Sequence, residues 1–313
     1  MNILIVSGFL GAGKTTFIRK LAEKSDKPFA VVENEYGGAG IDGNLLEQNR
    51  LKVWELTEGC VCCSLKSDFA MSVLTIANTV DPEYLVVEPT GVGLLSSVVA
   101  NLHKIEYERI RLLKPLTVVD IDCIDSYLAT FEKFYADQIK NAAHIVISKT
   151  ENKTEAEIEK AVRTLKSINP QADITAKPYD KIEKAWWGEL FDVTKNAFTG
   201  KTTLFPLPLS AAPDLETASF TGIAIQSIEE LISCLSALIA ERFGRVYRVK
   251  GFVPINGQWA KFDVVDKRYN IETCDAMSES KLTVIGKDLD KNALKLLFSC
   301  TEINFQAPYL KSR

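Results

Sequence analysis

Residues 8–15 read Gly-Phe-Leu-Gly-Ala-Gly-Lys-Thr and follow directly on a short apolar run at 2–7. This order of glycines, lysine and threonine is typical of a phosphate-binding loop placed between a buried strand and a helix. Backbone N–H groups and the positive end of the helix dipole then converge on one point, which suits a polyphosphate. The pattern therefore predicts a nucleotide site rather than an ordinary turn between a strand and a helix.

Each residue type in this loop has its own use. The glycines permit a tight curl of the backbone around the phosphates. The lysine reaches the β- and γ-phosphates, and the hydroxyl of the first threonine ligates Mg²⁺. The residues expected to contact the nucleotide here are Gly8, Gly11, Ala12, Gly13, Lys14, Thr15 and Thr16.

A second group of reactive side chains is the run Cys60-Val61-Cys62-Cys63. Three thiols that a turn brings together bind soft or borderline ions, of which Zn²⁺ is the commonest and Cu⁺ is also compatible. Two alternatives stay open, a redox couple formed by Cys60 and Cys63 and structural burial of free cysteines. We favour metal binding because structural thiols have no need to be adjacent.

Carboxylates follow two of the apolar runs. Glu88 closes the run at 84–87, and Gly91 follows three residues later. Beside a phosphate loop, such a carboxylate can hold Mg²⁺ or its water, and the glycine leaves room for a backbone N–H to meet a γ-phosphate. Glu33 begins a Glu-Asn-Glu-Tyr-Gly-Gly segment. It could touch Mg²⁺ or a cysteine-bound metal, although a solvated acidic turn fits that segment equally well.

The segment Ser148-Lys149-Thr150-Glu151 also lies at the end of a predicted strand. The Glu151 carboxylate could accept two hydrogen bonds from the N1–H and N2–H₂ groups of guanine, which adenine cannot supply. The stem of Lys149 would cover the base. Read alone, this four-residue pattern is equally typical of a solvated turn.

The elements that would position these residues alternate regularly between strand and helix. Strands are expected at 3–7, 29–33, 51–56, 84–88, 115–119 and 144–148, with helices at 14–24, 65–79, 93–102, 124–139 and 154–167. This alternation predicts a mostly parallel, doubly wound α/β sheet, in which ligands lie beyond the carboxyl ends of the strands.

The composition of the sequence changes at 201–216, where prolines and threonines predict a linker between a domain at 1–200 and a smaller one at 217–313. The second domain carries a strand pattern at 219–225, a helix pattern at 228–241 and later strands on either side of Asn256-Gly257. That dipeptide between apolar runs predicts a hairpin. A small α+β domain with an antiparallel sheet is therefore expected.

Composition excludes several classes of partner. A formal net charge of −4 and a pI of about 5.5 leave no basic footprint, so we expect binding neither to nucleic acid nor to a membrane surface. The N-terminus lacks the pattern of a cleaved signal, and no run reaches a membrane-spanning length. The 7 cysteines suit a reducing compartment. We expect a cytoplasmic protein.

Taken together, the phosphate loop, the Glu33 segment, the cysteine run, Glu88–Gly91 and Ser148–Glu151 closely resemble the CobW-like metallochaperone GTPases, which are relatives of UreG and HypB. The run at 245–252 resembles a strand of their C-terminal domain. The cysteine run inside a phosphate-loop protein is the specific element, because the loop alone is shared with many kinases and ATPases.

This resemblance implies a P-loop NTPase fold with a CobW-like C-terminal α+β domain, and slow, Mg²⁺-dependent hydrolysis of GTP to GDP. Lys14 would hold the phosphates, Thr15 and Glu88 would serve Mg²⁺, and Gly91 would meet the γ-phosphate. The cargo metal, Zn²⁺ or else Co²⁺ or Ni²⁺, would bind the three cysteines, and Glu33 would add an oxygen ligand. GTP binding would reorder residues 33–42 and 88–93, and hydrolysis would release them.

The chain departs from the family pattern in the guanine motif, usually Asn-Lys-x-Asp, where Ser148 and Glu151 stand instead. The strictness of guanine selection is therefore open, as are the client protein and a nucleotide-dependent dimer. An alternative from another class is a nucleotide-gated assembly factor for a metalloenzyme or corrinoid protein, with structural or redox cysteines. A small-molecule kinase would need an arginine-rich lid, which we do not find in the sequence.

Overall fold

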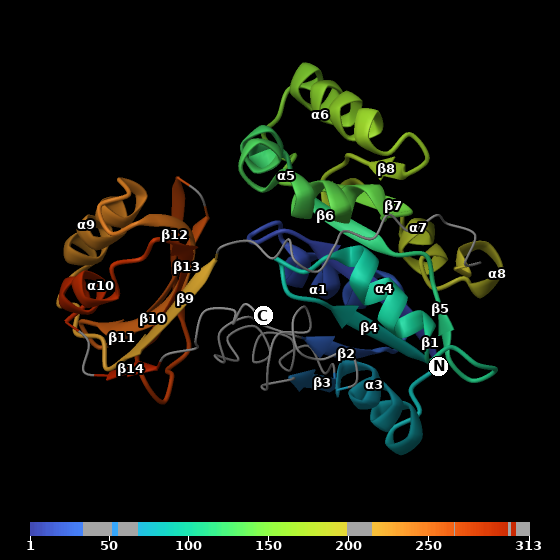
Figure 1. Cartoon of the computed structure of the whole chain (residues 1–313), viewed down its shortest axis with the longest axis horizontal. Helices are drawn as coiled ribbons and strands as arrows, with labels where there is room; N and C mark the ends of the chain where they lie inside the picture. Colours follow the sequence, from blue (N-terminus) through green and yellow to red (C-terminus); the bar gives the residue numbers. More distant parts are fainter. Residues whose placement is uncertain (34–51, 56–67, 199–214, 266, 300–301, 305–313) are drawn as a thin grey trace, which may run out of the picture. The chain divides into compact units, whose positions relative to one another are not determined.

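A computed structural model describes residues 1–33, 52–55, 68–198, 215–265, 267–299 and 302–304 (Figure 1). The chain divides into two compact units, Met1–Pro213 and Asp214–Arg313. Of the linker expected at 201–216, residues 201–214 lie outside the described residues. Leu215 is buried, and Glu216 begins a strand.

The first unit is a parallel sheet with helices between its strands. Its strands are β1 (Asn2–Gly8), β2 (Ala30–Glu33), β3 (Lys52–Glu55), β4 (Tyr84–Glu88), β5 (Arg111–Leu112), β6 (Leu116–Asp120), β7 (His144–Ser148) and β8 (Asp173–Thr175). The order across the sheet is β3-β2-β4-β1-β6-β7-β8, and β5 pairs with β1. Consecutive strands thus lie on both sides of β1, which confirms the predicted doubly wound sheet.

The helices of this unit follow the predicted alternation closely. They are α1 (Lys14–Lys24), α3 (Asp68–Thr79), α4 (Leu95–His103), α5 (Ile124–Lys140), α6 (Glu155–Ile168), α7 (Lys184–Glu189) and α8 (Val193–Asn196), with 3₁₀ turns at Ile121–Cys123 and Tyr179–Lys181. The sequence patterns did not predict β5, β8, α7 or α8, because each is too short to show a period.

Both faces of this sheet are covered, which explains why its central strands are almost continuously apolar. Leu4 and Val86 belong to a core that also contains Phe17 of α1 and Trp187 of α7. Residues whose side chains point to the opposite face of the sheet, such as Ile5, are equally buried. On that second face, the Thr117 hydroxyl of β6 donates a hydrogen bond to the backbone of α5.

The second unit is an antiparallel sheet covered by two helices. Its strands are β9 (Glu216–Thr221), β10 (Arg245–Ile255), β11 (Gln258–Val265), β12 (Arg268–Cys274), β13 (Lys281–Lys287) and β14 (Glu302–Asn304), and its helices are α9 (Ile228–Ile239) and α10 (Lys291–Leu297). The order is β12-β11-β10-β13-β9-β14. The expected α+β architecture is confirmed.

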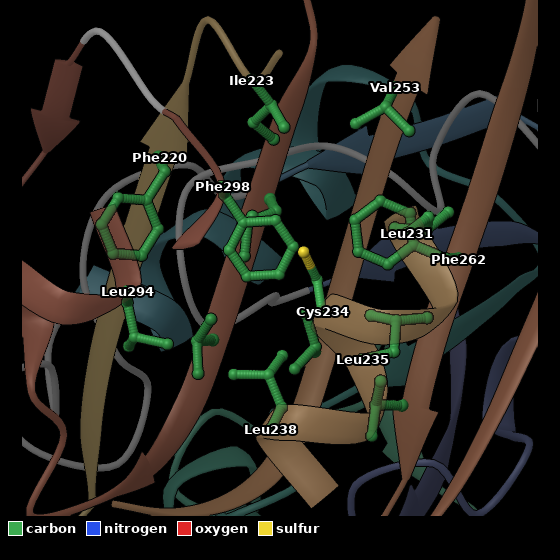
Figure 2. Packing of buried hydrophobic residues seen from close by; sticks show 14 of the residues in the cluster. Phe220, Ile223, Leu231, Cys234, Leu235, Leu238, Val253, Phe262, Leu294 and Phe298 are labelled. Atoms are coloured by element: carbon green, nitrogen blue, oxygen red, sulfur yellow. The ribbon is translucent and has the colours of Figure 1, made fainter. Parts of the chain in front are cut away.

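The core of the second unit lies between its sheet and helices, which cover the same face (Figure 1). Figure 2 shows Leu231, Leu235 and Leu238 of α9 pointing toward the apolar side chains of the strands, with Phe298 beside them. The spacing of these leucines places them on one side of the helix. Burial of this stripe fixes α9 on the sheet.

The turn between β10 and β11 has the conformation that its sequence predicts. Asn256 and Gly257 have φ angles of 51° and 81°, and Ile255 pairs with Gln258. This geometry is typical of a two-residue hairpin turn. The strand expected at 219–225 was misplaced, however, because β9 spans Glu216–Thr221 and ends before Gly222, which has a φ of 65°.

Among the helices that the structure describes, none combines the length and the apolar character that a membrane crossing requires.

Candidate nucleotide site

The glycine-rich loop curls tightly between β1 and α1. Gly8, Gly11 and Gly13 have φ angles of 149°, 69° and 93°, which L side chains rarely adopt. A Cβ atom at Gly8 would lie 2.4 Å from the carbonyl oxygen of Val118. Gly13 is the N-cap of α1 and offers no side-chain acceptor to the first turn of the helix. A glycine-rich loop that opens a helix in this way is the arrangement that binds anions in other proteins.

Lys14 lies at the base of this loop, against the carboxyl edge of the sheet. Its Nζ atom is 3.5 Å from the carbonyl oxygen of Phe9 and 3.7 Å from Glu88 Oε1. The side chains of Lys14 and Glu88 are only 6% and 12% exposed. Glu33 is in register with Glu88 on the neighbouring strand, and it is also buried. The structure thus brings one cation and two carboxylates together beside the loop.

The two threonines that follow Lys14 lie in the first turn of α1. Thr15 is partly buried and Thr16 is exposed. Both are therefore next to the cradle of loop amides, as the motif predicts. Thr15, Glu88 and Glu33 each carry an oxygen atom of the type that Mg²⁺ prefers.

Gly91 packs directly on the same loop. A Cβ atom at this position would lie 2.8 Å from Leu10 Cδ2 and 2.9 Å from the Leu10 backbone nitrogen. The chain after β4 therefore approaches the phosphate loop more closely than any side chain would permit. This close approach is the structural reason for glycine at position 91.

The segment after β7 is hydrogen-bonded to the phosphate loop. Ser148 Oγ donates to the carbonyl oxygen of Ala12 at 2.7 Å. Lys149 has a φ of 60°, and its Nζ atom donates to the carbonyl oxygen of Gly11 at 3.1 Å and to Asp120 Oδ2 at 2.7 Å. Because these contacts join two distant segments, the motif is more than a solvated turn. Glu151 is exposed beside them.

Two family models match the chain. The model described as "CobW/HypB/UreG, nucleotide-binding domain" matches residues 2–176, and the "Cobalamin synthesis protein cobW C-terminal domain" matches residues 220–301. The chain belongs to the CobW/HypB/UreG family. Its first unit is therefore a nucleotide-binding domain of this family, and the predicted membership is confirmed.

The names of several relatives of this CobW-family chain refer to zinc. The zinc chaperone YjiA of Escherichia coli is 25% identical over 316 residues, which cover 95% of this chain and 97% of that protein. The zinc-regulated GTPase metalloprotein activator 1 of Schizosaccharomyces pombe is 27% identical over 191 residues, covering 58% and 46% of the two chains. A crystal structure of Zn(II)-bound YjiA GTPase from E. coli matches with a TM-score of 0.46 at 20% identity, covering 96% of this chain and 98% of that one.

Sequence reasoning missed two residues that support the nucleotide site of this CobW-family chain. Asp120 ends β6, is buried, and accepts hydrogen bonds from Lys149 Nζ and from the backbone N–H of Asp122. Its place at a strand end, like that of Glu88, could have identified it. Tyr127 of α5 donates to the carbonyl oxygen of Leu10 at 3.4 Å, a contact that only the tertiary packing reveals.

Tyr179 is a third residue that the sequence did not single out. Its ring packs edge-on against Phe17, and its buried hydroxyl has no hydrogen-bond partner in the described part of the chain. Burial, together with the charges of Glu151 and Asp120, raises the pKa of this hydroxyl, so it stays protonated at neutral pH. A Cβ atom at Gly13 would lie 4.0 Å from it.

The predicted metal ligands Cys60, Cys62 and Cys63 lie outside the described residues. Within the described ranges, no group of three or more His, Cys, Asp and Glu side chains is arranged to hold a metal ion. Of the cysteines that are described, Cys123 donates to Asp120 Oδ2 and Cys234 belongs to the core of the second unit. The cysteine run therefore stays the candidate metal site of this family member.

Proposed function

We propose that this chain is a Mg²⁺-dependent GTPase that acts as a metallochaperone. It binds a transition metal, zinc in the first place, at Cys60, Cys62 and Cys63 and delivers it to a client protein or a cofactor pathway. The observation that carries the proposal is the convergence of Lys14, Glu88 and the Ser148 segment on one glycine-rich loop in a CobW/HypB/UreG domain. The names of the zinc chaperone and GTPase relatives support it.

The phosphates would be held by the loop amides, the first turn of α1 and the Lys14 ammonium group. Thr15 and Glu88 would hold Mg²⁺, which supplies charge neutralisation when it is bound. The Glu88 carboxylate lies 3.7 Å from the Lys14 ammonium group, so the group expected to hold Mg²⁺ and the group expected to hold the phosphates are neighbours. Hydrolysis in such a site consists of positioning and electrostatic stabilisation, and it is slow without a stimulating partner.

Nucleotide state would control metal affinity through the segments that begin at Glu33 and Glu88. These two residues are neighbours on adjacent strands, and they precede and follow the cysteine run in the sequence. A γ-phosphate that reorders either segment would therefore act on both sides of the thiols. In this scheme the metal is cargo, Glu33 adds an oxygen ligand, and a client receives the metal after hydrolysis.

The proposed organisation assigns residues 1–200 to the GTPase domain, 201–216 to the linker and 217–313 to the CobW-like C-terminal domain. We place the protein in the cytoplasm. A client metalloprotein is its expected partner, and a nucleotide-dependent dimer stays an open alternative to a monomer.

The enzymatic part of the proposal is tested by phosphate release from GTP. With Mg²⁺ we expect turnover on the order of 10⁻⁴–10⁻² s⁻¹, the range of unstimulated GTPases, and a further rise with Zn²⁺. Phosphate and GDP must be the only products, because a phosphorylated acceptor would indicate a kinase. Absence of turnover with Mg²⁺, both with and without Zn²⁺, would contradict the proposal.

Base selection is expected to depend on Glu151. The Glu151→Ala variant loses the carboxylate that we propose accepts from the guanine N–H groups. Hydrogen bonds to charged groups are worth about 1.5–3 kcal/mol. The preference for GDP over ADP should therefore fall by about tenfold to a hundredfold. Competition between labelled GDP and the two unlabelled nucleotides measures the change.

Glu155→Ala is the matched control, because Glu155 is an equally exposed carboxylate four residues away, in the first turn of α6. It should leave the preference unchanged. A Glu151→Ala variant with the selectivity of the wild type would show that the base is chosen by other groups.

A further inference from the structure

The turn that follows β4, residues 90–93, is hydrogen-bonded to a side chain of helix α5. In this turn, Gly93 N–H donates to the carbonyl oxygen of Thr90 at 2.9 Å. The side-chain amide of Gln138 donates from Nε2 to two of its carbonyl oxygens, those of Gly91 at 3.0 Å and Gly93 at 2.9 Å. One side chain, more than 40 residues away in the sequence, thus fixes both ends of the glycine pair.

Gln138 is itself firmly placed. It is completely buried, and its backbone carbonyl oxygen accepts a hydrogen bond from Thr117 Oγ1 of β6 at 2.9 Å. The preceding residue, Asp137, accepts at 3.1 Å from the backbone N–H of Ser96 in the first turn of α4. Two successive residues of α5 therefore hold the turn and the helix that follows it.

Helix α5 also contacts the phosphate loop. The Phe9 ring lies 4.8 Å from the ring of Tyr127 and 4.7 Å from that of Phe131, and the Tyr127 hydroxyl donates to Leu10. Leu10 is the residue on which Gly91 packs. The part of α5 up to its kink at Phe131 thus contacts the loop, and the part after the kink holds the turn.

The direction of the Gly91 carbonyl group decides what the turn presents to the loop. In a trans peptide the carbonyl and the next N–H point in opposite directions. Because Gln138 holds the Gly91 carbonyl on the α5 side, the N–H of Val92 points away from α5. Loss of the Gln138 amide would leave this peptide without that restraint.

The chemistry of Gln138 indicates that its amide is retained for these two donations. Its Oε1 atom is buried and has no hydrogen-bond partner within the described ranges. Burying an unsatisfied carbonyl group costs stability, and an apolar side chain of similar size would avoid the cost. The two contacts to the turn are what an apolar residue could not supply.

We propose that Gln138 is a positioning residue for the γ-phosphate. It holds the Thr90–Gly93 turn in the arrangement that receives this group, and so makes the protein bind GTP more tightly relative to GDP. The inference rests on the proposed function, because it assumes that this turn faces the γ-phosphate of GTP.

The test is the ratio of two affinities in the full chain with Mg²⁺. Gln138→Leu removes both donors at similar volume, and Gln138→Glu keeps the shape but sets a carboxylate oxygen against two carbonyl oxygens. For both variants, the affinity for a non-hydrolysable GTP analogue should fall about tenfold relative to that for GDP, the equivalent of one hydrogen bond. GTP turnover should fall as well, with little change in GDP affinity.

Asn169→Ala is the matched control, because it removes a buried hydrogen bond to the next residue of α5, Ile139, without touching Gln138 or the turn. It should lower the melting temperature and leave the ratio unchanged. Because both affinities are measured on the same variant, their ratio does not depend on how much of that variant is folded. If Gln138→Leu does not fold, Gln138→Glu provides the test. An unchanged or increased preference for the GTP analogue in a folded Gln138 variant overturns the inference. Failure of the wild type to bind guanine nucleotides would instead overturn the proposed function.

Discussion

Lys14→Met should lower GTP turnover by at least about a hundredfold, the loss typical of removing one preorganised donor from a charged transition state. Lys14 is buried beside the loop, with its Nζ atom 3.7 Å from Glu88. Methionine fills similar space but leaves the phosphates without their cation. It also removes the positive charge that offsets Glu88, so the binding of nucleotide and of Mg²⁺ should weaken together. Single-turnover phosphate release and GDP titration measure both effects.

Lys20→Met is the control for the same helix. Lys20 also pairs with carboxylates, Glu23 at 3.1 Å and Asp180 at 3.3 Å, but it is more exposed and lies away from the loop. Exposed ion pairs contribute little, so this variant should keep wild-type turnover. If folded Lys14→Met kept turnover within threefold of that of the wild type, the proposed role of Lys14 in phosphate binding would be contradicted.

Replacing Cys60, Cys62 and Cys63 together by serine should weaken Zn²⁺ binding by at least about a hundredfold. Thiolates are the strongest zinc ligands among protein side chains, and even loss of groups that only orient a ligand costs about ten- to a hundredfold. Competition with a chromogenic chelator measures the affinity, once with GDP and once with a GTP analogue. The wild-type affinity should differ between the two nucleotide states, and the triple variant should lose that difference.

Cys274→Ser provides the matched thiol control, because Cys274 is partly exposed on β12 in the second unit. It should leave zinc affinity unchanged. If the triple variant also kept wild-type affinity for Zn²⁺ and Co²⁺ in both nucleotide states, the metallochaperone proposal would fail. The assembly-factor alternative, with structural or redox cysteines, would then be favoured.

The sequence predicted the parts of the site whose chemistry is local. The phosphate loop, Glu88 and Gly91 could be placed because a strand followed by a glycine-rich turn constrains its own backbone. Glu33 was left undecided between a ligand and a solvated turn, and its register with Glu88 depends on the pairing of β2 with β4. Strand pairing is non-local, so no single segment encodes it.

Contacts between segments that are distant in the sequence could not be predicted from sequence patterns. Gln138 and Tyr127 belong to the amphipathic pattern of α5, which predicts burial but not the backbone atoms they reach. Ser148 was singled out only as part of the guanine motif, and its hydrogen bond to Ala12, across 136 positions of sequence, was not predicted. Short elements such as β8 and α7 were not predicted for another reason, because three to six residues are too few to show a periodic pattern.

The register of Glu33 with Glu88 sets two carboxylates side by side at a buried edge, with Lys14 near one of them. Like charges at neighbouring buried positions oppose folding, so the fold alone would be better served by amides there. Selection for ligand binding and selection for stability therefore pull these two positions in opposite directions. A descendant of this chain that abandoned its ligand would be released from the conflict, and we expect positions 33 and 88 to be among the first to drift to neutral residues.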